Sequence, residues 1–222
     1  MIASHDDFLK TQCPEIVAAV DQYATDVQRN AAANLTPRLT ALVRLAIALS
    51  IPNRDMARNA IEHARTVASD GEIAETVFVA CELKAGAATA YGRLAFKFTD
   101  PSGCGNDSHD PAQDRVYMRD FEKADPEAFA SLIHRIKTAH NPNSRLTTRE
   151  YELIAVACAT ISRCIYCIEK HSRDAKQAGA TDRDLADVVH LVIASRVDGT
   201  LEEWNAVAIA HEQAVEAPVR RG

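Results

Sequence analysis

Residues 149–181 read REYELIAVACATISRCIYCIEKHSRDAKQAGAT, and this stretch decides the fold class. Within it, apolar residues over 152–161 recur at intervals of three and four, which is the period of an α-helix with one buried face. The same period runs through 39–50 and 185–197, alanine is abundant, and no segment shows the alternation of a half-buried strand. The sequence therefore predicts an all-α protein.

The composition is that of a soluble globular protein. The chain has 222 residues, 47% of them hydrophobic and 25% charged, and this length allows one large domain or two small ones. The net charge of -6 argues against a nucleic-acid-binding surface, since such surfaces are usually basic. The longest apolar stretch, 41–51, contains Arg44 and is too short to cross a bilayer, and the N-terminus has no signal-peptide pattern. We expect a cytoplasmic protein that binds neither nucleic acid nor membrane.

The two halves of the chain resemble each other. Similar residues recur at a spacing of 111 to 113 positions: Phe8 and Phe121, Pro14 and Pro126, Thr36 and Thr147, Arg38 and Arg149, Glu72 and Asp184, Gly86 and Gly199. Such a constant register predicts duplication of one helical unit. We expect an N-terminal module over 1–99, a linker loop over 100–115, and a C-terminal module over 116–222. The linker is rich in Gly, Pro, Asn and Asp, and we expect it to be exposed; the role of its Cys104 stays open.

The cysteines fall into two groups. There are six, too few for a disulfide framework in a chain of this length, and close cysteines in a reducing compartment are usually catalytic or metal-binding. Cys13, Cys81 and Cys158 lie in segments with helical apolar periodicity, where we expect them in the core. Cys164 and Cys167 form a close pair that is a candidate for chemistry.

Cys164, Cys167 and His171 occupy positions i, i+3 and i+7 of a helix and so share one face. Glu152 lies 12 residues before Cys164, about 18 Å away along an unbroken helix and too far to cooperate. If the chain instead turns near 161–163 and the next helix runs back, Glu152 and His171 lie at similar depth and can meet. The order Glu, His, Cys, Cys then forms a proton relay that ends in a thiolate.

These residue types suit thiol redox chemistry. The thiolate is the reactive form of cysteine, and a neighbouring histidine or helix N-terminus favours it. A second thiol three residues away can attack the oxidised first one and form a disulfide. Because an i, i+3 pair inside a helix is slightly too far apart for good disulfide geometry, we expect Cys164 in or before the first helical turn. Proximity to His171 favours Cys167 as the attacking thiol and Cys164 as its resolving partner, while the helix N-terminus favours the reverse.

The stretch resembles the AhpD-like members of the carboxymuconolactone decarboxylase family. Their signature is a Glu, eleven residues, then Cys-x-x-Cys-x-x-x-His, which here comprises Glu152, Cys164, Cys167 and His171. The likeness covers 146–199 and extends more weakly, by way of the repeat, to the first half. Some AhpD proteins carry a second histidine immediately before the second cysteine; here Tyr166 stands in that place and offers a hydroxyl donor instead.

The resemblance implies an AhpD-like fold of two helical modules and a cysteine-based alkylhydroperoxidase or disulfide oxidoreductase with an antioxidant role. It implies a hydroperoxide substrate, an external dithiol reductant or redox partner protein, no bound cofactor or metal, and a homo-oligomer, with a trimer favoured. The first half carries Ala41, Asn53, Met56 and Ala60 at the positions that match the site. We therefore expect one thiol site per chain and an architectural N-terminal module.

Other interpretations of the same residues stay open. The two cysteines can be small core residues, and Glu152 a surface or interface charge. Cys164, Cys167 and His171 can also bind zinc, with Glu152 or His109 as the fourth ligand, although this spacing is unusual for structural zinc. The alternative activity is that of a carboxymuconolactone decarboxylase-like lyase, although the family's decarboxylases generally lack the dithiol. A non-catalytic redox-responsive protein is the third hypothesis.

Overall fold

The computed structural model describes residues 3–100, 113–139 and 145–216, which form helices and short connections with no β-strand among them. The predicted all-α fold is confirmed. The helices are α1 (Ala3–Gln12), α2 (Pro14–Asn34), α3 (Pro37–Ser50), α4 (Arg54–Val67), α5 (Asp70–Gly92), α6 (Leu94–Thr99), the 3₁₀ helix η1 (Gln113–Arg115), α7 (Val116–Ala124), α8 (Pro126–Ala139), α9 (Thr148–Ser162), α10 (Ile165–Gln177) and α11 (Asp182–Glu216). Across these described segments, no helix has both the length and the hydropathy that a membrane-spanning segment requires.

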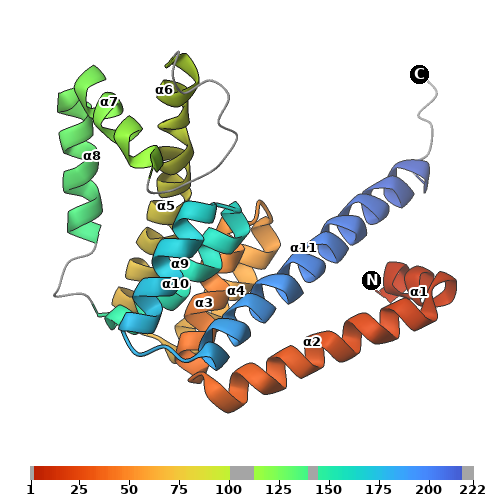
Figure 1. Cartoon of the computed structure of the whole chain (residues 1–222). Coiled ribbons are helices and arrows are strands. Elements are labelled where there is room, and N and C mark those ends of the chain that lie inside the picture. Colours follow the sequence, from red (N-terminus) through yellow and green to blue (C-terminus); the bar gives the residue numbers. More distant parts are fainter. Residues whose placement is uncertain (1–2, 101–112, 140–144, 217–222) are drawn as a thin grey trace, which may run out of the picture.

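Helices α3 and α9 lie at the centre of the molecule (Figure 1). They pack against each other, and each also packs against α5 and α11. Their inner faces supply side chains that are fully buried: Leu42, Leu45, Ile47, Leu153 and Ile154. Because burial of one such side chain contributes roughly 1.5–3 kcal/mol, this central pair provides a large part of the hydrophobic stabilisation.

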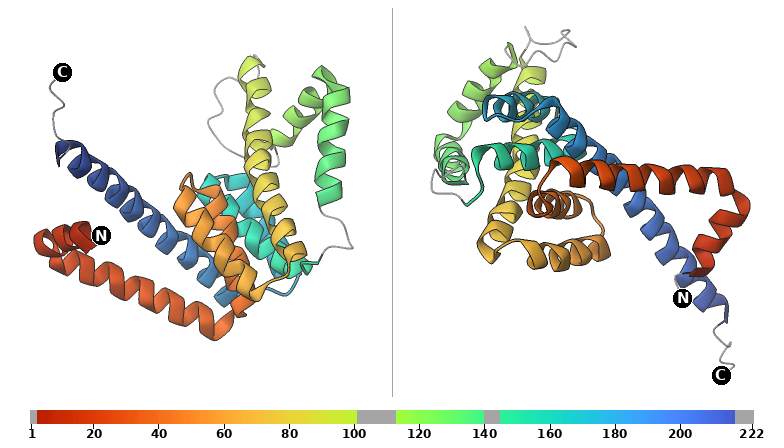
Figure 2. Two further views of the ribbon diagram at one scale, coloured as in Figure 1. Left: turned by 180° about the vertical axis from the view of Figure 1, so that it is seen from behind. Right: turned by 90° about the horizontal axis from the view of Figure 1, so that it is seen from below.

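Two groups of helices extend from this centre (Figure 2). The first comprises α1, α2 and the C-terminal half of α11, where the rings of Phe8 and Trp204 stack with centroids 6.1 Å apart. The second comprises α6, α7 and α8. There Phe121 packs against Phe96 and Phe129, with ring centroids 5.7 and 5.6 Å apart. The candidate site lies between this second group and helices α5 and α10.

The helices recur in the register that the sequence predicts. Helices α3, α4 and α5 begin at residues 37, 54 and 70, while α9, α10 and α11 begin at residues 148, 165 and 182. The N-terminal capping residues correspond as well, since Thr36 matches Thr147 and Asn53 matches Cys164. These correspondences support the proposed division into two modules.

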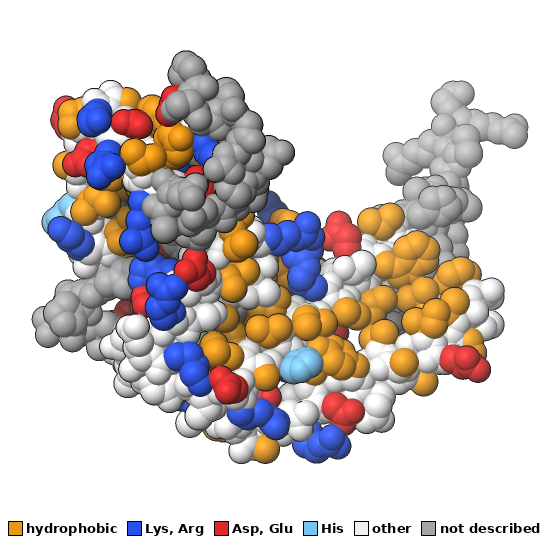
Figure 3. Space-filling model, in the orientation of Figure 1, with side chains coloured by type: hydrophobic (Ala, Val, Ile, Leu, Met, Phe, Trp, Pro, Cys, Tyr) orange, Lys and Arg blue, Asp and Glu red, His pale blue; other side chains and the backbone are white. Residues whose placement is uncertain are grey.

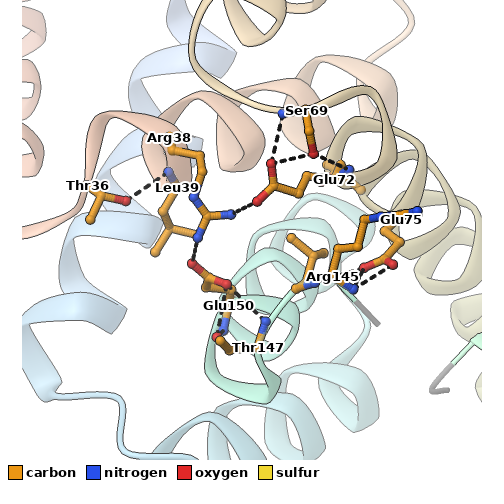
Figure 4. A network of polar contacts seen from close by, with 11 residues as sticks. Thr36, Arg38, Leu39, Ser69, Glu72, Glu75, Arg145, Thr147 and Glu150 are labelled. Carbon is orange, nitrogen blue, oxygen red and sulfur yellow. Dashed lines mark hydrogen bonds and ion pairs between the residues drawn. The ribbon is translucent and has the colours of Figure 1, made fainter. Parts of the chain in front are cut away.

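One arginine joins the start of α5 to the start of α9 (Figure 4). Both helices begin with a capping box, in which Ser69 pairs with Glu72 and Thr147 pairs with Glu150. Arg38 on α3 lies between the two glutamates and donates a hydrogen bond to each. The backbone N–H and hydroxyl of Ser69, together with the charge of Arg38, lower the pKa of Glu72. A single guanidinium therefore holds two helix N-termini together.

Arg149 makes the corresponding ion pair in the second half. Its guanidinium donates to Asp184 at 2.7 Å, and the backbone N–H of Thr181 donates to the same carboxylate at 2.7 Å. Asn34 adds a third hydrogen bond at 2.9 Å. Burial alone would raise the pKa of Asp184, but these hydrogen bonds outweigh it and lower the pKa. The ion pair between an arginine and a cap carboxylate thus recurs in both halves.

The segment predicted to be an exposed linker has one buried residue near its C-terminal end. Residues 101–112, with Cys104 and His109, lie outside the described residues. Asp114, in η1, has an exposed fraction of only 1% and accepts hydrogen bonds from Lys97 at 2.9 Å and from the Tyr166 hydroxyl at 2.6 Å. The expectation of an exposed loop is therefore wrong for this residue, because its carboxylate has two buried partners.

Replacing Arg38 with Met should lower the free energy of unfolding by about 1–3 kcal/mol, because two largely buried carboxylates lose their common cation. Urea denaturation measures this change. Arg58→Met is the matched control, since Arg58 pairs with Asp55 at 2.7 Å on the exposed surface of α4 and such pairs contribute about 0–1 kcal/mol. Equal losses in the two variants would contradict the role assigned to Arg38.

Candidate active site

The chain reverses direction between α9 and α10. Helix α9 ends at Ser162, and Arg163 adopts a left-handed conformation with φ of 54°, which turns the backbone back on itself. Cys164 then caps the N-terminus of α10, and its sulfur accepts a hydrogen bond from the backbone N–H of Cys167 at 3.3 Å. The predicted reversal, and the predicted place of Cys164 at the helix start, are confirmed.

The two sulfurs of the predicted pair are joined in a disulfide. The Cα atoms of Cys164 and Cys167 are 5.2 Å apart, inside the range that disulfides adopt. The Cys164 side chain is completely buried, whereas Cys167 has an exposed fraction of 7% and lines a cavity. Of the two sulfur-bearing residues, Cys167 is therefore the one that a ligand in this cavity meets.

His171 and Glu152 form a buried pair across the two helices. Nδ1 of His171 lies 2.6 Å from Oε2 of Glu152, and the side chains are 9% and 6% exposed. Such a contact between residues 19 positions apart requires the antiparallel arrangement of α9 and α10 that the sequence predicts. Cys164, Cys167, His171 and Glu152 thus lie together at one site. The interpretation of Glu152 as a surface charge does not fit its burial.

The cavity beside Cys167 has a volume of about 250 Å³. Helices α5, α7, α8, α9 and α10 supply its walls, through Glu82, Leu83, Gly86, Thr89, Ala90, Met118, Ile136, Tyr151, Tyr166, Cys167, Lys170 and His171, and Arg93 joins them from between α5 and α6. No group of three or more His, Cys, Asp and Glu side chains within the described ranges is arranged to hold a metal ion. The residues that line the cavity combine apolar walls with a few polar groups, which is the usual composition of small-molecule sites.

A polar cluster that the sequence analysis missed supports the first turn of α10. The Tyr166 hydroxyl donates to Asp114, which also accepts from Lys97, and the guanidinium of Arg93 lies 4.2 Å from the centre of the Tyr166 ring. Burial and the bond to Asp114 raise the pKa of Tyr166. Burial alone would raise the pKa of Asp114, but its hydrogen bonds with Tyr166 and Lys97 lower it. Asp114 was placed in the linker, and no motif marks Arg93 or Lys97.

The remaining described cysteines divide differently from the prediction. Cys158 is buried, as expected, and burial raises the pKa of its thiol to about 11. Cys13 and Cys81 are exposed, so the expectation that they belong to the core is wrong. Cys13 is the residue that precedes α2, and Cys81 lies on an outer face of α5 beside a separate cavity. Apolar periodicity predicts that a residue lies in a helix, but it does not define which residues at the edge of the apolar face are buried.

The matching positions of the first half carry different chemistry. Asn53 caps α4, as Cys164 caps α10, through hydrogen bonds from the backbone N–H groups of Asp55 and Met56. Met56 and Ala60, which match Cys167 and His171, line a smaller cavity of about 200 Å³. The first half therefore has the N-terminal helix cap and a cavity. It has neither thiols nor an imidazole at the positions that match Cys164, Cys167 and His171.

Residues 126–212, from the start of α8 into α11, match the family model of the carboxymuconolactone decarboxylase family. This part of the chain is similar to the carboxymuconolactone decarboxylase family. It contains the whole set Glu152, Cys164, Cys167 and His171. The family resemblance predicted from these residues is confirmed.

A solved structure shares the fold of the whole chain. It is the crystal structure of a candidate gamma-carboxymuconolactone decarboxylase subunit from Burkholderia xenovorans. The TM-score is 0.65, and the alignment covers 96% of this chain and 92% of that one. At 16% identity, this likeness to a family member shows the fold alone. Among curated proteins, none matches the sequence.

Replacing Asp114 with Asn should flatten the acid dependence of stability. The pKa of Asp114 in the folded protein lies below its unfolded value of about 4, so its contribution is present at neutral pH and is lost as the pH falls through the folded value. Urea unfolding at about pH 6, 4 and 3 should show a steeper loss of stability for the wild type than for Asp114→Asn. Parallel pH profiles would contradict the lowered pKa.

Iodoacetamide should modify Cys13 and Cys81 in the native protein and leave Cys158 unmodified, because the Cys158 thiol is buried and its pKa is about 11. Peptide mass spectrometry reads each site separately. In urea, Cys158 should react as fast as Cys81, which serves as the internal control. Equal rates in the native protein would show that Cys158 is accessible.

Proposed function

We propose that the protein is a thiol-dependent hydroperoxidase or disulfide oxidoreductase that works through Cys164 and Cys167. The observation that carries this proposal is the disulfide at the N-terminus of α10, placed beside the buried pair of His171 and Glu152. A dithiol, an imidazole and a carboxylate in one buried site are the groups that a cysteine-based peroxidase needs.

The cycle starts from the reduced dithiol. The Cys167 thiolate attacks the terminal oxygen of a hydroperoxide, so that an S–O bond forms, the O–O bond breaks, and the alkoxide takes a proton and leaves as an alcohol. The Cys164 thiolate then attacks the sulfenic sulfur of Cys167, forming the disulfide and releasing hydroxide, which is protonated to water. An external dithiol reduces the disulfide and becomes a disulfide itself.

The exposure of the two sulfur-bearing residues supports this assignment of roles. Cys167 lines the cavity, whereas Cys164 is completely buried behind it. A hydroperoxide in the cavity therefore reaches Cys167 first, and Cys164 is within bonding distance once Cys167 is oxidised. The helix N-terminus favours a thiolate at Cys164, which suits its second, resolving attack.

His171 carries out the proton transfers, and Glu152 positions it. Glu152 engages Nδ1, which fixes the orientation of the imidazole and leaves Nε2 as the nitrogen that exchanges protons. His171 lines the same cavity as Cys167, which supports its role of taking the thiol proton and returning it to the departing alkoxide. Glu152 acts through His171 and is a positioning residue.

The second candidate function is a carboxymuconolactone decarboxylase-like lyase. The Burkholderia xenovorans structure, named for that activity, favours it, because the fold is shared over almost the whole chain. A lyase mechanism does not require the dithiol, so lyase activity that survives loss of both cysteines would select this function. A change of oligomeric state on oxidation, without turnover, would select the non-catalytic redox-responsive protein.

We further propose that the chain forms a homo-oligomer, with a trimer favoured. Figure 3 shows hydrophobic side chains gathered over α1, α2 and α11, and among the exposed residues of these helices are Phe8, Ile16, Trp204 and Val207. A cavity of about 420 Å³ with largely apolar walls lies between α2 and α11. An exposed apolar surface of this kind is typical of a protein interface. The dithiol reductant implies a reducing compartment, so a cytoplasmic location remains part of the proposal.

Wild-type protein supplied with dithiothreitol should consume tert-butyl hydroperoxide, and Cys167→Ser should abolish this activity because the attacking sulfur is missing. Glu152→Gln should reduce the rate about 10- to 100-fold, since the imidazole loses its orienting charge. Cys13→Ser is the matched control and should keep the wild-type rate, because Cys13 is exposed and lies outside the site. Peroxide loss is followed colorimetrically. Equal rates for the wild type and Cys167→Ser would refute the proposal.

One equivalent of hydroperoxide should convert the reduced protein to the Cys164–Cys167 disulfide with loss of two hydrogen atoms. Cys164→Ser should instead stop at the Cys167 sulfenic acid, which gains one oxygen atom, because the resolving thiol is absent. Intact mass and peptide mapping distinguish these products. Accumulation of the sulfenic acid on Cys164 in Cys167→Ser, with none on Cys167 in Cys164→Ser, would reverse the roles of the two cysteines.

A further inference from the structure

Arg93 is a buried cation in the wall of the Cys167 cavity. It follows the last residue of α5 and precedes α6, and its exposed fraction is 7%. Its Nε and Nη2 atoms are buried, and no described residue accepts a hydrogen bond from either of them. A guanidinium stays charged at every physiological pH, so burying these two donors without an acceptor is costly.

The neighbouring carboxylates of the described chain are already paired. Asp114 accepts hydrogen bonds from Lys97 and from Tyr166, and its charge also acts on Arg93 without a hydrogen bond from Nε or Nη2. Glu82 lines the cavity but forms an ion pair with Arg135 at 3.0 Å. The carboxylate of Glu152 is engaged by the imidazole of the site.

The ring of Tyr166 does not replace an anion for Arg93. The guanidinium lies 4.2 Å from the ring centre, which gives a cation–π contact with one face of the guanidinium plane. Donors in that plane still need acceptors at its edge. Arg93 lines the cavity, so a ligand there lies beside this guanidinium. The structure therefore offers a guanidinium with two unpaired donors in the wall of the cavity beside Cys167.

The shape and walls of the cavity indicate which anion fits. Its volume of about 250 Å³ suits a small molecule, and Leu83, Ala90, Met118 and Ile136 make much of its wall apolar. The other cation at its edge, Lys170, is directed to Asp174 on the outside of α10. One planar guanidinium in a largely apolar cavity matches a single carboxylate on a short carbon chain, which it can bind through two parallel hydrogen bonds.

We propose that Arg93 binds the carboxylate of the substrate, so that the preferred oxidant is a small organic hydroperoxide that carries a carboxylate. The carboxylate end of the substrate sits against Arg93 and its hydroperoxide end against Cys167, since both residues line one cavity. Arg93 is then a specificity-determining residue. The reaction part of this inference rests on the proposed function, whereas the carboxylate site itself does not.

Binding is tested without turnover, using the disulfide form and hexanoate as the probe. Calorimetry should show saturable binding of hexanoate to the wild type and at least tenfold weaker binding of hexanamide, which has the same shape without the charge. Arg93→Gln should weaken hexanoate binding about 10- to 100-fold, and Arg93→Lys should restore part of it. Arg58→Gln, an exposed arginine of α4, is the charge-matched control and should bind like the wild type. Equal affinity of the wild type for hexanoate and hexanamide would overturn the proposal.

Turnover provides the second test, with 6-hydroperoxyhexanoate and tert-butyl hydroperoxide as the charged and neutral substrates. Arg93→Gln should lower kcat/KM for the charged substrate at least tenfold, mainly by raising KM. The same variant should change kcat/KM for the neutral substrate less than threefold. An equal loss for both substrates would overturn the proposal, because Arg93 would then act on the reacting oxygen or on the fold. If wild type consumes neither substrate, the proposed peroxidase function fails, while the hexanoate measurement still decides whether Arg93 binds a carboxylate.

Discussion

The reversal of the chain at Arg163 is the constraint on which the site depends. It ends α9 in a left-handed residue and starts α10 at Cys164, so two helices that would otherwise be continuous run antiparallel. Only in this arrangement does Glu152 reach His171 at 2.6 Å. In one straight helix, the 19 residues between them would span about 28 Å. The acid, the imidazole and the two sulfurs form one site because the backbone turns within two residues.

Much of this arrangement could be predicted from local sequence. The three-and-four periodicity gave the helical class, and the spacing of Cys164, Cys167 and His171 placed them on one helix face. The distance argument for Glu152 then required a turn, and disulfide geometry required Cys164 near the helix start. Each of these steps uses residues fewer than 20 positions apart, where helix geometry alone fixes the separation.

The other parts of the site come from segments that are distant in the sequence, so patterns within one segment do not predict their position. Arg93 stands between α5 and α6, and Asp114 lies in η1, yet both contact Tyr166 on α10. Their position depends on how the α6–α8 group packs against α5 and α10, which is set by long-range contacts. The misplaced Cys13 and Cys81 have a related cause. Periodicity shows that a helix has a buried stripe, but tertiary packing decides its edges.

Comparison of the two halves separates the structural role of Cys164 from its chemical one. Asn53 occupies the matching position and caps α4 through its side-chain oxygen, so this position needs an acceptor whether or not the module carries thiols. The sulfur of Cys164 meets that need by accepting from the backbone N–H of Cys167, and it does so while the disulfide is present. The Cys164–Cys167 disulfide therefore lies within the same helical turn that the cap hydrogen bond stabilises. If the proposed redox function holds, this geometry favours repeated turnover at a fixed site over a large rearrangement of the fold.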